Sequence, residues 1–289
     1  MRRFSLASRR LTVLLTCLAA FAWCVSSRAD DAKTPGQRVF YTGHSFHMFV
    51  PQGVEQLVKS AGIENHKLAG TQSLGGSRVH QHWDLEEAKN KAKPALESGQ
   101  IDIFTMAAHL EIPDRGITSF TELGLAHNPN LRLLVQASWM PYDITDFTAP
   151  EKHIKDNAER DGIDVAALRD STKVWRTKLE AQADDLNKKH GRKAVYVVNV
   201  GDAVNTLREQ IVAGKFPGVT KQSELFRDPI GHGNGHVMAL CTYCNFVAIY
   251  RRTPEGLKMN TMGVDDAQHA ILQRIAWETV SAYPYSGVK

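Results

Sequence analysis

The sequence predicts an α/β fold: a doubly wound, three-layer α/β/α sandwich on about five parallel strands. Short apolar runs alternate with segments of helical periodicity along the chain. Strands separated by helix-length segments pair in parallel through right-handed crossovers. The 289 residues contain no internal repeat and no low-complexity tract, and one large domain can bury a substantial core at this length.

Five segments are expected to form the sheet. The first reads R-V-F-Y-T, the second is weaker, and the last three are strongly apolar and rich in β-branched or aromatic residues. The strands are expected at residues 38–42, 64–70, 101–107, 131–137 and 194–200. Together they account for the central layer of the sandwich.

The segments between the strands are expected to form helices. Apolar residues of 54–61 share one helix face, and residues 85–96 have a helical pattern. Residues 150–193 are polar but carry an apolar stripe, which predicts a helical insertion that packs on one edge of the domain. Residues 264–280 are expected to form an amphipathic helix capped by Asp265 or Asp266.

The first 29 residues are typical of a cleavable export signal. Four arginines precede an apolar run at 11–25, and small residues follow it up to Ala29. We expect cleavage after Ala29, so that residues 30–289 form one exported domain, periplasmic or secreted. Without the five arginines of residues 1–29, 30 basic residues face 31 acidic ones. A nearly neutral chain argues against nucleic acid as a partner, and against a membrane once the signal is removed.

Cys241 and Cys244 are the cysteines that remain after this cleavage. Oxidising conditions outside the cell allow a bridge between them. They fall, however, on the apolar face of a predicted helix, together with Val237, Leu240 and Ala248. The favoured interpretation is a pair of buried, inert thiols.

A serine follows the first predicted strand, in the loop Gly43-His44-Ser45-Phe46-His47. Ligands of open parallel sheets bind at the carboxyl ends of the strands. A serine that opens a helix there presents its hydroxyl to the crevice and its N–H to developing negative charge. Serine is also a common helix cap, so this loop alone does not establish a site.

Three sequence blocks together resemble the SGNH (GDSL-type) hydrolases over nearly all of the predicted mature chain. The blocks are V-F-Y-T-G-H-S-F at 39–46, L-G-G-S at 74–77 and R-D-P-I-G-H at 227–232. The resemblance implies Ser45 as nucleophile, with Asp228 and His232 completing a triad. It also implies that N–H groups of Ser45 and of Gly75 or Gly76 hold the oxyanion.

The chain departs from the family pattern in three places. His44 replaces the aspartate of the first block, and the Asp–His spacing of the last block is one residue longer. The asparagine of the third block is missing, and His109 is the candidate for the third oxyanion donor. Between the two histidines that follow Asp228, His232 is favoured as the base over His236.

The resemblance therefore implies a serine esterase that needs no cofactor and no metal, and that acts on a small-molecule or carbohydrate ester. Two alternatives stay open. A metal-dependent hydrolase would use the histidines at the same sheet edge, with ligands drawn from His44, His80, His82, Asp228 and His232. A carbohydrate-binding protein without catalysis would keep the fold alone.

Overall fold

The computed structural model describes Met1 and residues 34–288. The predicted export signal and its cleavage after Ala29 lie outside the described residues, apart from Met1, and stay a prediction. In the part of the chain that the structure describes, every helix is too short or too polar to span a bilayer.

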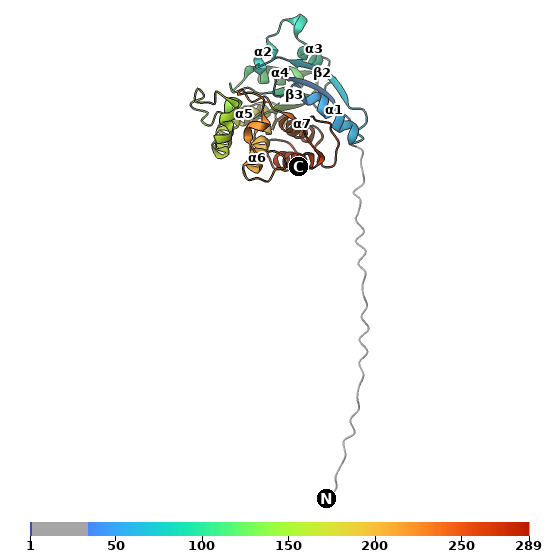
Figure 1. Cartoon of the computed structure of the whole chain (residues 1–289). Helices are drawn as coiled ribbons and strands as arrows, with labels where there is room; N and C mark the ends of the chain where they lie inside the picture. Colours follow the sequence, from blue (N-terminus) through green and yellow to red (C-terminus); the bar gives the residue numbers. More distant parts are fainter. Residues whose placement is uncertain (2–33, 289) are drawn as a thin grey trace. The chain divides into compact units, whose positions relative to one another are not determined.

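One parallel sheet organises residues 34–288. Its spatial order is β2-β1-β3-β4-β5, and each neighbouring pair is parallel. Helices cover both faces (Figure 1), so the predicted doubly wound α/β/α fold is confirmed. The strands are β1 (Arg38–Gly43), β2 (Lys67–Ser73), β3 (Ile103–Ala107), β4 (Arg132–Gln136) and β5 (Val195–Val198).

The side chains of the strands alternate between two cores, as the pleat of a sheet requires. In β1, Val39 and Tyr41 pack into one core and Phe40 packs into the other, where it stacks on Phe104 of β3. The sequence places four strands within two residues of their ends. It places β2 three residues too early, because β2 is a largely exposed edge strand whose apolar pattern is weak.

Two sets of helices bury these cores. The first set is α1 (Val50–Ser60), α6 (Val200–Val212), α7 (Gly235–Tyr250) and α8 (Asp266–Ser281). The second set is α2 (Val79–Trp83), α3 (Ala92–Glu97), α4 (Arg115–His127) and α5 (Val165–Lys189). Short 3-10 turns η1 (Glu87–Lys89), η2 (Pro141–Asp143), η3 (Asn157–Gly162) and η4 (Gln222–Leu225) lie between them.

Polar side chains set where several helices begin. The Asp265 carboxylate accepts the N–H of Gln268 at 2.8 Å, so Asp265 rather than Asp266 caps α8. The single helix expected at 85–96 is instead η1 followed by α3. Asn90 causes the break, because its side-chain oxygen accepts the N–H groups of Ala92 and Lys93 and starts α3 afresh.

Helix α7 is buried over nearly its whole length, against α1, α6 and α8. Cys241 and Cys244 lie on it as free thiols, fully buried, and burial raises the pKa of both. A thiol that resists ionisation is a poor nucleophile. The structure thus agrees with the interpretation of this pair as inert core residues.

Candidate active site

The loop after β1 holds Ser45 in a closely packed turn. A Cβ on Gly43, the last residue of β1, would lie 2.9 Å from the Cβ of Ala107, so the strand end has room only for glycine. From the end of β4, the buried Gln136 amide donates to the Phe46 carbonyl at 3.0 Å. These contacts fix the backbone on both sides of the serine.

Ser45, His232 and Asp228 form one hydrogen-bonded chain. Ser45 Oγ lies 2.9 Å from His232 Nε2, and His232 Nδ1 lies 2.6 Å from Asp228 Oδ2. A proton on Nδ1 is bound by the carboxylate, so Nε2 is left to accept the serine hydroxyl proton. The Phe46 ring packs edge-on against the imidazole, with ring centroids 5.5 Å apart.

The longer Asp–His spacing is accommodated by a turn closed by the aspartate itself. Asp228 Oδ1 accepts the backbone N–H of Gly231 at 3.0 Å and that of His232 at 3.1 Å. Gly231 has φ +100°, a conformation that favours glycine. Burial opposes ionisation of Asp228, but the hydrogen bonds from His232 and Gly231 outweigh it and lower the pKa of the carboxyl group. The carboxylate is therefore charged at neutral pH.

A cavity of about 290 Å³ opens beside Ser45, and its walls are almost entirely apolar. The loops after β1 to β4 contribute most of the lining, joined by α5 and the loop before His232. The lining residues are His44, Ser45, Phe46, Gly76, Ala108, His109, Leu110, Ser138, Trp139, Pro141, Tyr142, Ile144, Trp175 and Ile230.

Three of the four expected oxyanion residues line this cavity. They are Ser45, Gly76 and His109, whereas Gly75 lies next to the lining in the same turn. Within the described chain, the backbone N–H groups of Ser45 and Gly76 are not engaged in hydrogen bonds. His109 Nδ1 is buried without a partner, which favours the tautomer whose proton is on Nε2.

His44, at the position where the SGNH sequence pattern has an aspartate, supports the serine turn. Its Nε2 lies 3.3 Å from the Ala108 carbonyl, and its Nδ1 accepts the Phe46 N–H at 3.2 Å. Burial lowers the pKa of His44 to about 4, so the ring is neutral. Both ring nitrogens are thus engaged with the backbone.

The histidines after β2 have other partners. His82 Nε2 lies 2.8 Å from Ser77 Oγ, and burial lowers the pKa of His82 to about 4. His80 Nδ1 lies 3.5 Å from an oxygen of Asp114, the cap of α4. Across residues 34–288, His, Cys, Asp and Glu side chains form no group of three or more that could hold a metal ion. The geometry therefore does not favour the metal alternative.

His236 lies in the first turn of α7, away from the serine. Its Nε2 lies 3.1 Å from the Gln268 side-chain oxygen, and its ring packs edge-on against Phe216. The structure thus places His232, and not His236, against Ser45.

Several residues of the site were not among the candidates predicted from the sequence. Trp139 and Tyr142 follow β4 and line the cavity. Because ligands of parallel sheets bind at the carboxyl ends of the strands, the loop after the fourth predicted strand could have indicated them. Trp175 was expected only as part of a packing stripe in the 150–193 insertion. Its indole also lines the cavity and donates to the His109 carbonyl at 3.2 Å.

Comparison with known proteins supports the fold. A DUF4886 family protein from Bacteroides uniformis aligns with 88% of this chain and 97% of its own, with a TM-score of 0.56 and 15% identity. A candidate SGNH hydrolase from Slackia heliotrinireducens aligns with 73% of this chain and 97% of its own (TM-score 0.44, 13% identity). Phospholipase A1 from Streptomyces albidoflavus aligns with 74% and 99% (TM-score 0.43, 11% identity).

The chain shares the fold of the Bacteroides uniformis protein. No protein-family model and no curated protein sequence matches the chain. At identities this low, the structural likeness concerns the fold alone, and the chemistry follows from the site.

Proposed function

We propose that the protein is a serine esterase in which Ser45 is the nucleophile, His232 the general base and Asp228 the residue that orients the base. The observation that carries the proposal is the continuous Ser45–His232–Asp228 hydrogen-bond chain, whose serine lines an apolar cavity. It combines a nucleophile, a base within reach and a carboxylate that fixes the base.

The proposed reaction has two halves. His232 Nε2 takes the hydroxyl proton as Ser45 Oγ bonds to the ester carbonyl carbon, and Asp228 stabilises the imidazolium that forms. The imidazolium then gives this proton to the leaving alcohol, and an acyl-serine remains. Water attacks the acyl group with its proton going to His232, which then gives this proton to Ser45 Oγ as the acid leaves.

The oxyanion of each tetrahedral intermediate needs donors aimed into the cavity. The unengaged N–H groups of Ser45 and Gly76 are two candidates, with that of Gly75 adjacent. His109 is the third, in the place where the family pattern has an asparagine. Its favoured tautomer puts the proton on Nε2, the nitrogen that is not sealed in the interior.

The cavity supports an apolar acyl or aryl group on the acid side of the ester. Apolar surface is stabilised by leaving water for walls of this kind, and Leu110, Ile144 and Trp175 are among the side chains it would contact. For the alcohol side of the ester we propose a broader range of groups, which includes the sugar of an acylated carbohydrate outside the cell. Intact-mass analysis of exported protein tests that location, with a chain starting at Asp30 expected.

A fluorophosphonate probe tests the proposal directly, because it phosphonylates an activated serine. Wild-type protein and Ser77→Ala are expected to be labelled on residue 45, and Ser45→Ala is expected to be unlabelled. Hydrolysis of p-nitrophenyl esters should follow the same pattern and should be unaffected by a chelator. Unlabelled wild-type protein, or hydrolysis that a chelator removes and zinc restores, would overturn the assignment.

A further inference from the structure

The loop that carries Asp228 and His232 is bound from outside by Arg160, a residue of the 150–193 insertion. Arg160 Nη2 donates to the Asp228 carbonyl at 3.0 Å and to the Pro229 carbonyl at 2.7 Å. Neither contact involves the Asp228 carboxylate. The arginine therefore fixes the backbone from which the carboxylate and imidazole project.

The next two carbonyls of the loop are bound by the segment after β4. The Tyr142 N–H donates to the Ile230 carbonyl at 2.9 Å, and the Trp139 indole donates to the Gly231 carbonyl at 2.8 Å. Four successive carbonyls, from residue 228 to residue 231, thus accept hydrogen bonds from other segments. Such an arrangement suits a loop whose glycines would otherwise leave it many conformations.

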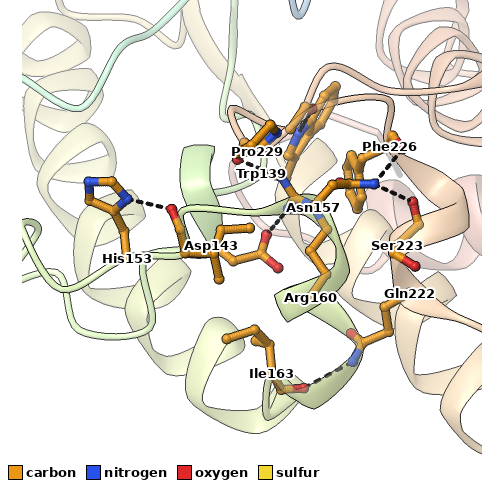
Figure 2. Close-up of polar contacts among 12 residues, drawn as sticks. Trp139, Asp143, His153, Asn157, Arg160, Ile163, Gln222, Ser223, Phe226 and Pro229 are labelled. Atoms are coloured by element: carbon orange, nitrogen blue, oxygen red, sulfur yellow. Dashed lines mark hydrogen bonds and ion pairs between the residues drawn. The ribbon is translucent and has the colours of Figure 1, made fainter.

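Arg160 is itself held rigidly (Figure 2). Its Nη1 pairs with the buried Asp143 carboxylate, and its Nε donates to Asn157 Oδ1 at 2.8 Å. The guanidinium lies over the Phe226 ring, 4.4 Å from its centroid. Its side chain is 0% exposed. Every edge of the guanidinium is engaged, so its position determines that of the loop.

Arg208 offers a matched comparison, because it shares most of this environment. It binds the same Asp143 carboxylate through two hydrogen bonds, at 2.9 and 2.6 Å, and it lies 5.6 Å from the same Phe226 ring. Its Nε donates to Gln222 instead. Arg208 makes none of the hydrogen bonds to the carbonyls of residues 228–231.

We propose that Arg160 is a positioning residue of the active site, which sets the Asp228–His232 pair against Ser45 through the loop backbone. The inference rests on the proposed function for its kinetic consequence, but its geometric consequence can be measured without turnover. A displacement of about 1 Å in a catalytic group can lower a rate about 10²-fold. Loss of the two carbonyl contacts permits a displacement of that size.

Arg160→Lys and Arg208→Lys form the test pair. Lysine keeps a positive charge beside Asp143, but one ammonium group cannot occupy the four positions that the Arg160 guanidinium fills. We expect Arg160→Lys to lower kcat on a p-nitrophenyl ester about 10²-fold with little change in KM. Arg208→Lys should lose similar thermal stability with kcat close to wild type. Equal kcat in the two variants would overturn the inference.

The resonance of the His232 Nδ1 proton gives a second measurement, which separates this inference from the esterase proposal. A proton between a ring nitrogen and a carboxylate oxygen that lie 2.6 Å apart is strongly deshielded. We expect this NMR signal in wild type and Arg208→Lys, and its loss or upfield shift in Arg160→Lys. Wild-type protein with the signal but without turnover would contradict the esterase alone. An unchanged signal in folded Arg160→Lys would contradict the positioning role.

Should Arg160→Lys fail to fold, Trp139→Phe tests the same loop contacts. It keeps an aromatic ring on Phe46, where the two rings stack 4.5 Å apart, and removes the donor to the Gly231 carbonyl together with part of the indole. We expect a loss in kcat of about tenfold and a shifted His232 signal. A wild-type signal together with wild-type kcat in this variant would contradict the dependence of the His232 position on the carbonyl donors.

Discussion

The structure contains two serine–histidine pairs of the same residue types, which differ in the chemistry that their surroundings allow. Ser45 Oγ lies 2.9 Å from His232 Nε2, and Ser77 Oγ lies 2.8 Å from His82 Nε2. By distance alone the two are equivalent. A short serine–histidine contact is therefore not sufficient evidence of a catalytic site.

The partners of each pair make the difference. Beyond His232 lies the carboxylate of Asp228, whereas His82 Nδ1 lies 3.4 Å from the amide nitrogen of Gln72. An amide donor favours a neutral ring with the proton on Nε2, and it cannot stabilise an imidazolium.

The serine hydroxyls differ as well. The Ser77 hydroxyl donates to the Leu74 carbonyl at 2.9 Å, so its proton is already committed to the backbone. Ser45 lines the cavity, whereas His82 is only 1% exposed. The first pair can transfer a proton to a substrate, and the second holds the turn after β2.

The largest expected effect is the loss of Ser45 or His232. Ser45→Ala and His232→Ala should each lower kcat by about 10⁴-fold or more, and by similar factors, because triad members act as a unit. Steady-state hydrolysis of a p-nitrophenyl ester measures this. His236→Ala serves as the control and should stay close to wild type. If His236→Ala is the inactive variant, His232 is not the base.

Asp228→Asn tests whether the carboxylate is what distinguishes the two pairs. An amide at residue 228 would favour the wrong tautomer of His232, with the proton on the nitrogen that faces Ser45. We expect kcat to fall about 10⁴-fold. The rate of fluorophosphonate labelling should fall with it, while circular dichroism stays unchanged. A labelling rate near wild type would mean that the His232–Ser45 contact suffices without the carboxylate.

His109→Phe tests the cavity side of the first pair. If the imidazole donates to the oxyanion, its removal should lower kcat about 10²–10³-fold with little change in KM. His109→Gln, which can still donate, should retain more activity than His109→Phe. Equal activities in the two variants would limit His109 to a packing role.

The sequence predicted the layer structure and the sheet edge at which these groups meet, because both follow from the order of strands and helices. It placed Ser45 at that edge because Ser45 follows the first strand. Asp228 and His232 were assigned from the resemblance of their block to the SGNH pattern. The contacts of Arg160 could not be predicted in the same way. A lone arginine in a polar stretch, 68 residues from Asp228, carries no pattern that marks its burial.

His82 of the second pair, with His44 and His47 of the loop that carries Ser45, should make stability depend on pH. Burial lowers the pKa of His44 and His82 to about 4 and that of His47 to about 3, against about 6.5 in an unfolded chain. Between pH 6.5 and 4 the unfolded state therefore binds more protons, so folding stability falls as pH falls. Urea unfolding at pH 7 and pH 5 should differ by several kcal/mol. His82→Gln should make the free energy of unfolding depend less on pH. If the wild-type free energy of unfolding does not change with pH, the histidines are not buried in their neutral form.

The smallest expected effect is that of Ser77→Ala, which removes the serine of the second pair. The buried N–H of His82 would lose its acceptor, a loss that costs about 1–3 kcal/mol of unfolding free energy. Activity should fall by less than about tenfold, because the Leu74 N–H still donates to the Gly43 carbonyl at 3.2 Å and holds the turn.

The double variant Ser77→Ala with His82→Phe distinguishes the loss of a hydrogen bond from the loss of side-chain packing. Replacing both partners by apolar groups removes the buried His82 donor together with its acceptor, so part of the stability lost in Ser77→Ala should return. The Gln72 amide, which loses its contact with His82 Nδ1, limits this recovery. In a double-mutant cycle the two changes should thus be non-additive in the free energy of unfolding. Additive losses would mean that His82 stabilises the turn through other contacts. The same double change at residues 45 and 232 should restore no activity, because that pair is defined by proton transfer rather than by packing.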